Sequence, residues 1–133
     1  MPKVLIVDDS AWARALVRQV LEGTGVEGLE ILEAGDGEDA LEVMVTERPG
    51  FVVLDLVLPG MRGEEVLAKA RAAGFDGTVV VLTADVQEST REALAAAGAD
   101  GFVTKPLVGA AAEDLAGLVK RFAGGEGKGE SGG

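Results

Sequence analysis

Residues 51–55 read Phe-Val-Val-Leu-Asp, a short apolar run that ends on a carboxylate. Three further apolar runs also lead into polar groups, namely Val4–Val7 before Asp8 and Asp9, Val79–Leu82 before Thr83, and Gly101–Thr104 before Lys105. Runs of this length, separated by helix-like stretches, are typical of buried strands in a parallel sheet. Because open α/β sheets bind ligands at the carboxyl ends of their strands, we expect these polar groups to meet at one edge. The sequence thus predicts a charged site that holds three carboxylates, a hydroxyl and an ammonium.

The strand and helix patterns alternate along the chain, which predicts an α/β fold with a parallel sheet of five strands and five helices. The expected strands span residues 3–7, 29–33, 51–55, 78–83 and 101–104. The expected helices begin near Ser10 and after Asp36, whose side chains can cap a helix, and then span residues 64–73, 87–97 and 108–122. In the second helix we expect Leu41, Met44 and Val45 to face the core.

The composition limits what the chain can do. Its 133 residues suit one domain with a sizeable core, and a formal net charge of −11 argues against direct binding to nucleic acid. The chain contains no cysteine, which excludes thiolate metal sites, and no histidine, so it cannot form a phosphohistidine. Its apolar runs are too short to span a membrane, and residues 1–20 lack the layout of a signal peptide. We therefore expect a cytoplasmic protein without membrane contact.

Residues 124–133 are rich in glycine and carry no large apolar side chain. Such a segment cannot bury enough apolar surface to fold, so we expect a disordered tail after a folded domain at residues 1–123. The tail can be native, or it can be part of a linker to a further domain; we favour the first reading.

Taken together, these motifs resemble the receiver domain of two-component response regulators. The matching pieces lie within residues 3–122 and comprise Asp8-Asp9, the stretch from Asp55 to Gly63, Thr83-Ala84 and Lys105-Pro106. The resemblance implies a doubly wound, flavodoxin-like sheet with strand order 2-1-3-4-5 and five flanking helices, in a stand-alone, chemotaxis-type single-domain response regulator. We also expect a monomer or weak dimer.

Asp8, Asp9 and Asp55 form the predicted acidic cluster. Two carboxylates about 4 Å apart repel each other by roughly 4 kcal/mol at an effective dielectric constant of about 20, and a divalent cation relieves this repulsion. A few hard oxygen ligands suit Mg²⁺ or Mn²⁺, and the resemblance adds the backbone carbonyl of Val57 as a further ligand. The alternative is that Asp8, Asp9 and Ser10 only cap the first helix.

Asp55 is the candidate nucleophile, because carboxylates can form covalent aspartyl phosphates. The ammonium of Lys105, together with the metal, would neutralise charge on the transferred phosphoryl group, and the hydroxyl of Thr83 would donate to a phosphoryl oxygen. Lys105 and Thr83 can also have purely structural roles. Lys105 can form a structural salt bridge with Asp55, and Thr83 can be a strand-end residue that suits a β-sheet.

Three neighbouring residues acquire roles from the resemblance. Ala84 is small and would leave the phosphoryl pocket open, and Pro106 would follow a cis peptide bond that positions Lys105. Phe102 stands where receivers carry an aromatic switch residue, so Thr83 and Phe102 would move together on phosphorylation. Alternatively, Phe102 is a core residue that never moves.

We therefore expect a signalling switch that takes a phosphoryl group onto Asp55 with Mg²⁺ and contacts a downstream protein through its fourth helix, fifth strand and fifth helix. The donor would be a sensor histidine kinase or a histidine phosphotransfer protein, and catalysis would be limited to the chain's own phosphorylation and dephosphorylation. The alternatives are a flavodoxin-like ligand-binding protein, a small aspartyl-phosphate hydrolase and an unphosphorylated receiver adaptor. Contiguous Asp8-Asp9-Ser10 argues against the first two, since it would repel a flavin phosphate and lacks the spacing of the hydrolase pair.

Overall fold

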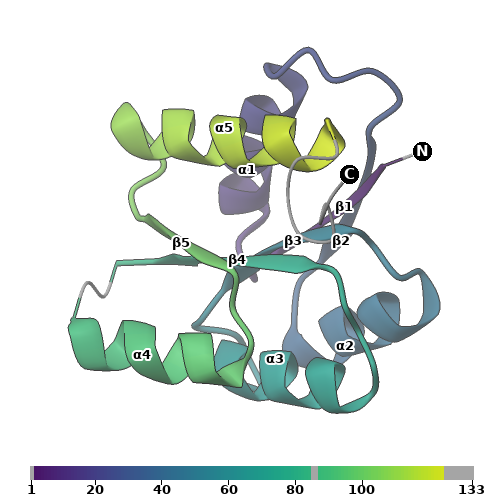
Figure 1. Cartoon of the computed structure of the whole chain (residues 1–133), viewed down its shortest axis with the longest axis vertical. Coiled ribbons are helices and arrows are strands. Elements are labelled where there is room, and N and C mark those ends of the chain that lie inside the picture. Colours follow the sequence, from purple (N-terminus) through teal and green to yellow (C-terminus); the bar gives the residue numbers. More distant parts are fainter. Residues whose placement is uncertain (1, 85–86, 125–133) are drawn as a thin grey trace.

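The computed structural model describes residues 2–84 and 87–124, in which strands and helices alternate throughout (Figure 1). The strands are β1 (Lys3–Val7), β2 (Glu30–Ala34), β3 (Phe51–Asp55), β4 (Thr78–Thr83) and β5 (Gly101–Thr104). The helices are α1 (Ala11–Glu22), α2 (Gly37–Thr46), α3 (Gly63–Ala72), α4 (Glu88–Ala97) and α5 (Ala110–Ala123). Of the expected tail at residues 124–133, all but Gly124 lies outside the described residues.

Neighbouring strands of the sheet are parallel and follow the order β2-β1-β3-β4-β5, which confirms the expected doubly wound fold. β1 lies between β2 and β3, so that Val7 is paired with Ala34 on one side and with Leu54 on the other. The chain reverses its direction across the sheet at β1, and the loops after β1 and β3 lead to helices on opposite faces (Figure 1). Such a switch point opens a crevice at the carboxyl ends of the two strands.

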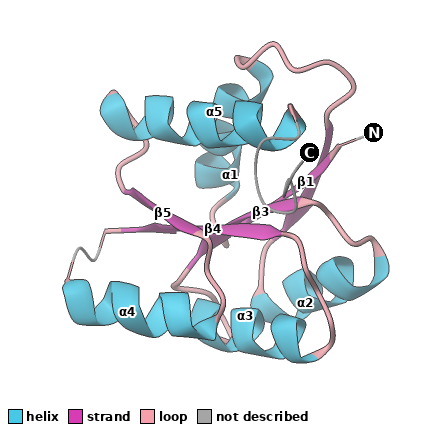
Figure 2. Ribbon diagram, viewed as in Figure 1, coloured by secondary structure: helices cyan, strands magenta, loops and turns pink. Residues whose placement is uncertain are grey.

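Helices cover both faces of the sheet: α1 and α5 lie on one face, and α2, α3 and α4 lie on the other (Figure 2). The side chains of β1 alternate between two cores. Val4 and Ile6 pack with residues of α1 and α5, whereas Leu5 and Val7 pack with residues of α2 and α3. This double coverage explains why β1, β3 and β4 read as nearly continuous apolar runs, whereas the edge strand β2 is only partly buried. Within the described ranges, no helix is both long and apolar enough to cross a membrane.

The first two helices begin where the capping side chains predict. Ser10 Oγ accepts a hydrogen bond from the backbone of Ala13 at 3.1 Å, and Asp36 Oδ1 accepts one from Asp39 at 2.8 Å. Each contact satisfies a backbone N–H group that the helix itself leaves without a partner.

One predicted core residue of α2 is wrong. Met44 is fully buried, as expected, but Val45 is 39% exposed. Gly37, Ala40 and Met44 are the buried residues of this helix, and their spacing of three and four places them on one face. Val45 follows Met44 directly and therefore points away from that face.

The start of α5 also differs from the prediction, because the helix begins at Ala110 rather than at residue 108. Gly109 has a φ of 56°, which is outside the helical region and is readily adopted only by glycine. The N–H of Val108 donates to the carbonyl of Pro106 at 2.9 Å, so these residues form a turn before the helix.

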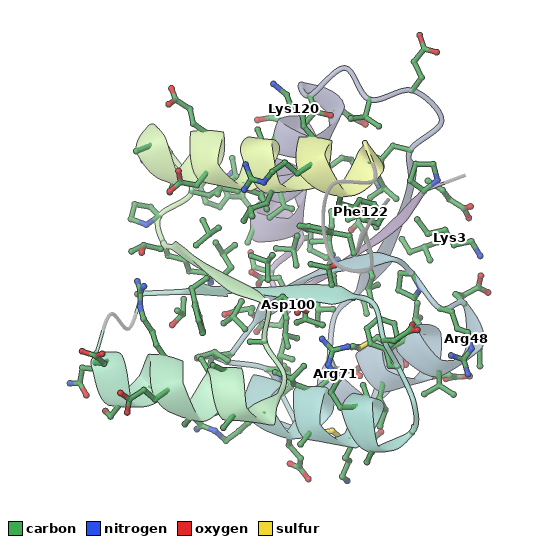
Figure 3. All side chains as sticks on the ribbon, in the orientation of Figure 1. Lys3, Arg48, Arg71, Asp100, Lys120 and Phe122 are labelled. Carbon is green, nitrogen blue, oxygen red and sulfur yellow. The ribbon has the colours of Figure 1, made fainter. Side chains whose placement is uncertain are left out.

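Arg71 ties the end of α3 to the segments that precede β4 and β5. Its guanidinium donates to the carbonyl oxygens of Phe75 at 2.9 Å, Gly77 at 2.8 Å and Gly98 at 2.7 Å, and to Asp100 Oδ2 at 2.9 Å. Arg71 and Asp100 are labelled in Figure 3. Because Gly77 and Asp100 precede β4 and β5, this network lies at the edge of the sheet opposite to the carboxyl ends of the strands.

Candidate functional site

The acidic residues that we expected to form a site come together at the carboxyl ends of β1 and β3. Asp55 ends β3, Asp8 and Asp9 directly follow β1, and one carboxylate oxygen from each lies within 4.8 Å of the others. Val7 pairs with Leu54, which brings the residues that follow them to the same level of the sheet. Asp8 and Asp55 are buried, whereas Asp9 is exposed. The cluster therefore has a buried floor and one side that is open to solvent.

Lys105 follows β5 and reaches this cluster with its ammonium group. Its Nζ lies 3.2 Å from Asp55 Oδ2 and 3.7 Å from Asp8 Oδ2. Its backbone N–H donates to the carbonyl of Thr83 at 2.9 Å, which extends the pairing of β4 and β5 to the edge of the sheet. The Lys105–Pro106 peptide bond is cis, the isomer that the resemblance implies. The ion pair with Asp55 is compatible both with a structural role of Lys105 and with a role in the site.

The surroundings of Asp8 disfavour its ionised form. Burial is the largest effect and raises the pKa of its carboxyl group above the ordinary value. The 3.0 Å hydrogen bond from the N–H of Ser10 lowers the pKa. The negative charge of Asp55 raises it, and the positive charge of Lys105 lowers it. Among the described residues, Asp8 Oδ2 is a buried oxygen without a hydrogen-bond partner, although it lies near the Lys105 ammonium. Buried acceptors are normally paired, so this oxygen is well suited to bind a cation.

The donor set of this cluster fits a small, hard cation. Asp8, Asp9 and Asp55 offer neighbouring carboxylate oxygens, and one of these oxygens is the buried Oδ2 of Asp8. Mg²⁺ and Mn²⁺ prefer such ligands, and Mg²⁺ keeps several waters that substrate phosphate oxygens can replace. The exposed side of Asp9 leaves space for those waters.

The loop after β3 lies tightly against the end of the strand. The N–H of Gly63 donates to the carbonyl of Leu56 at 2.9 Å, and a Cβ atom at Gly63 would lie 2.7 Å from the carbonyl oxygen of Asp55. A side chain at this position would therefore displace the backbone beside the acidic cluster. Val57, in the same loop, is exposed, and its N–H lies 3.4 Å from Asp55 Oδ1. The role of its carbonyl as a metal ligand stays a prediction.

The other expected residues lie on the neighbouring strands. Thr83 is buried at the end of β4, and Ala84 follows it at an exposed position. Phe102, in β5, is partly buried, and the guanidinium of Arg91 lies 5.5 Å from the centre of its ring. The coupled movement of Thr83 and Phe102 stays a prediction, since the structure holds one position of each side chain.

A mostly apolar cavity of about 430 Å³ adjoins the acidic cluster, between α1 and the loop after β5. Asp8 and Lys105 are the charged residues of its lining, and Ala84 also lines it. Trp12 and Val108, which are 73% and 64% exposed, lie along its wall. Our sequence analysis did not single out Trp12, although a lone aromatic residue three positions after the acidic pair is a visible signal.

Arg14 is a second residue that sequence reasoning missed. Its Nη1 donates to the backbone carbonyl of Asp8 at 2.6 Å, and its Nε donates to Glu33 Oε1 at 2.7 Å. Glu33, in β2, also accepts hydrogen bonds from Arg18, and the hydrogen bonds from Arg18 and Arg14 lower the pKa of the Glu33 carboxyl group. Arg14 therefore connects β2 to the acidic loop through a main-chain acceptor, which leaves no mark in a sequence.

Comparison with known proteins identifies the class. The family model described as the response regulator receiver domain matches residues 4–117. The response regulator MprA of Mycolicibacterium vanbaalenii is 36% identical over an alignment that covers 97% of this chain and 55% of that protein. A protein-glutamate methylesterase/protein-glutamine glutaminase of Myxococcus xanthus is 45% identical over 106 residues, which cover 78% of this chain and 30% of that protein. The crystal structure of a CheY-like response regulator receiver domain protein from Methanospirillum hungatei has a TM-score of 0.81 and 27% identity, and the match covers 100% of this chain and 99% of that chain.

The chain belongs to the response regulator receiver domain family, which confirms the class that its motifs indicated. Receiver domains of this family are phosphorylated on an aspartate, bind Mg²⁺ at the acidic pocket and interact with histidine kinases and downstream effectors. Membership argues against the flavodoxin-like and hydrolase alternatives. The matches span 30% and 55% of the two curated relatives, so the activities of those whole proteins are not transferred to this chain.

Proposed function

We propose that this chain is a phosphorylation-dependent switch in which Asp55 accepts a phosphoryl group from a histidine of another protein. The observation that carries the proposal is the arrangement of charge around Asp55. Lys105 Nζ lies 3.2 Å from its Oδ2, and carboxylate oxygens of Asp8 and Asp9 lie within 4.8 Å of its own. A carboxylate flanked by an ammonium and by a candidate metal site suits phosphoryl transfer, in which positioning and charge neutralisation supply most of the catalysis.

The proposed transfer forms one bond and breaks one. A carboxylate oxygen of Asp55 bonds to phosphorus while the bond between phosphorus and the donor imidazole nitrogen breaks, and the electron pair of that bond returns to the imidazole. A Mg²⁺ or Mn²⁺ ion held by Asp8, Asp9, Asp55 and the carbonyl of Val57 would supply positive charge to the phosphoryl oxygens.

The neighbouring side chains also bind the phosphoryl group or leave space for it. Lys105 exchanges its contact with Asp55 for one with a phosphoryl oxygen, and Thr83 donates its hydroxyl to another. Ala84 leaves space beside the phosphoryl group, and the ring of Pro106 restricts the backbone that follows Lys105. Catalysis by the chain is then limited to its own phosphorylation and dephosphorylation.

The partners follow from this chemistry. The donor is a sensor histidine kinase or a histidine phosphotransfer protein, since receiver domains interact with histidine kinases and this chain has no histidine of its own. The phosphorylated form contacts a target protein through the face made by α4, β5 and α5, where Phe102 lies beside Arg91. The net charge of −11 disfavours nucleic acid as the target. We propose that the chain acts in the cytoplasm as a monomer or weak dimer.

The test is labelling by a small phosphodonor. Acetyl phosphate with Mg²⁺ should add one phosphoryl group to the wild-type chain, as measured by intact-protein mass spectrometry, and EDTA should suppress the addition. Asp55→Asn should stay unlabelled, because an amide cannot form the acyl phosphate. Asp76→Asn is the matched control, since it changes an exposed carboxylate between α3 and β4, and it should be labelled like the wild type.

Equal labelling of Asp55→Asn and the wild type would overturn the assignment of the phosphoacceptor. A wild-type chain that neither acetyl phosphate nor a phosphorylated histidine protein labels would favour the unphosphorylated adaptor instead.

A further inference from the structure

We infer that Arg14 is a positioning residue of the metal site: its guanidinium holds the main chain of Asp8 so that the carboxylates of Asp8 and Asp9 face Asp55. The inference rests on the proposed function, because it concerns the Mg²⁺ site on which phosphorylation of Asp55 depends. It assigns a role to a side chain that lies outside the acidic cluster.

Arg14 links helix α1 to strand β2 and to the loop after β1. Its Nη1 donates to the Asp8 carbonyl at 2.6 Å, and its Nε donates to Glu33 Oε1 at 2.7 Å. The side chain of Arg14 is 20% exposed, so most of its surface is packed against the protein. A guanidinium presents its donors in a rigid, planar fork, and fixing one donor on Glu33 therefore fixes the direction in which the other points.

The loop that Arg14 holds carries two of the three candidate ligands. Asp8 is fixed on its amide side by a hydrogen bond from its N–H to the Ala34 carbonyl at 3.2 Å, and its Oδ1 accepts from Ser10 at 3.0 Å. Arg14 supplies the contact on the carbonyl side, at the peptide bond that joins Asp8 to Asp9. Without that contact, this peptide group can rotate, and repulsion between the carboxylates favours conformations in which they lie further apart.

The experiment measures Mg²⁺ affinity rather than activity. Isothermal titration calorimetry with MgCl₂ gives the dissociation constant of each folded variant, well below its melting temperature. Arg14→Met should raise the dissociation constant about tenfold or more, which is the usual effect of removing a group that orients a metal ligand. Arg18→Met is the matched control, because Arg18 shares Glu33 and lies one turn further along α1, and its described ion pairs go to Glu33 and Glu22. Its dissociation constant should stay close to that of the wild type.

Two further variants test how Arg14 acts. Arg14→Lys keeps the positive charge but cannot bridge both acceptors in the same way, so its affinity should remain below that of the wild type. Full affinity in Arg14→Lys would show that charge alone is required, and would overturn the positioning role. Glu33→Gln weakens the bond that orients Arg14 and should reduce affinity in the same direction; it also replaces Arg14→Met if that variant does not fold.

The outcomes separate this inference from the proposed function. A wild-type chain that does not bind Mg²⁺ would contradict the proposed metal site itself. If the wild type binds Mg²⁺ and Arg14→Met binds it equally well, or if Arg18→Met loses as much affinity as Arg14→Met, only the role of Arg14 is overturned.

Discussion

At Asp8, the needs of the metal site conflict with those of the fold. The site needs an ionised carboxylate, whereas burial makes the charged form costly for the free energy of folding. Burial raises the pKa of the Asp8 carboxyl group, so the folded state binds its proton more tightly than the unfolded state does. Its favourable contribution to the free energy of unfolding is therefore present below the ordinary pKa and is lost as the pH rises through the folded-state pKa. In EDTA, Asp8→Asn should raise the melting temperature near neutral pH, and this gain should shrink as the pH falls.

The substitution preserves the local turn, because the amide oxygen of an asparagine can still accept the 3.0 Å hydrogen bond from Ser10. Asp9→Asn is the control: Asp9 is exposed, so its substitution should change the melting temperature less. Thermal melts of both variants over a range of pH values provide the comparison. A gain for Asp8→Asn that does not vary with pH would show that the ionisation of Asp8 is not its cause.

At the same scale, the sequence predicted the residues that end a strand but missed those that act through the backbone. Asp8, Asp55 and Lys105 could be placed together because each follows a buried apolar run, and parallel strands bring such positions to one edge. Arg14 could not be placed, because its acceptor is the carbonyl of Asp8. Every residue has such a carbonyl, so no pattern of side chains indicates which one is bound.

At the scale of elements, Arg71 is the main polar connection at the amino ends of β4 and β5. We expect Arg71→Met to lower the free energy of unfolding by about 3 kcal/mol, because carbonyl oxygens of three residues and the Asp100 carboxylate lose a charged donor. For a domain of this size, the melting temperature should fall by roughly 10 °C. Chemical denaturation and thermal melts measure the two quantities.

Arg62→Met is the matched control for this prediction. The side chain of Arg62 is 74% exposed and pairs with Glu64 at 3.3 Å, and such surface pairs contribute little to stability. If both variants lose the same stability, the network around Arg71 does not stabilise the fold as proposed. Mg²⁺ affinity should be unchanged in Arg71→Met, since Arg71 lies at the opposite edge of the sheet from Asp55.

The face formed by α4, β5 and α5 should respond to phosphorylation through Thr83. Moving a conformer from about 1% to about 99% requires roughly 5.5 kcal/mol, whereas one hydrogen bond to a charged group supplies only about 1.5–3 kcal/mol. Thr83→Ala should therefore weaken the response of Phe102 without abolishing it, while phosphorylation of Asp55 persists. Amide NMR shifts of residues 87–104, with and without beryllofluoride, measure the response. A full wild-type shift pattern around Phe102 in Thr83→Ala would contradict this coupling.

The elements themselves were largely predictable, and the exceptions have local causes. β1, β3 and β4 were found because burial on both faces makes them nearly continuous apolar runs. The start of α5 was placed two residues early because a positive φ at Gly109 cannot be read from its neighbours. Val45 was assigned to the core of α2 because it is apolar, although the small residues Gly37 and Ala40 define the buried face.

At the scale of the whole molecule, the net charge of −11 and the metal site predict two distinct responses to salt. NaCl should stabilise the fold modestly by screening the repulsion between acidic groups. MgCl₂ at matched ionic strength should stabilise it further, by about 1.4 kcal/mol when its concentration is ten times the dissociation constant, because the ion binds only the folded state. Melting temperatures in the two salts measure the difference. The additional effect of Mg²⁺ should disappear in Asp8→Asn/Asp9→Asn, and its persistence there would place the ion elsewhere.

The position of Trp12 has an optical consequence. It is the chain's single tryptophan, and the chain has no tyrosine, so its near-ultraviolet fluorescence comes almost entirely from one indole. That indole lines the same cavity as Asp8 and Lys105. Its emission is therefore a built-in, label-free probe whose intensity or wavelength can follow events beside the acidic cluster in real time.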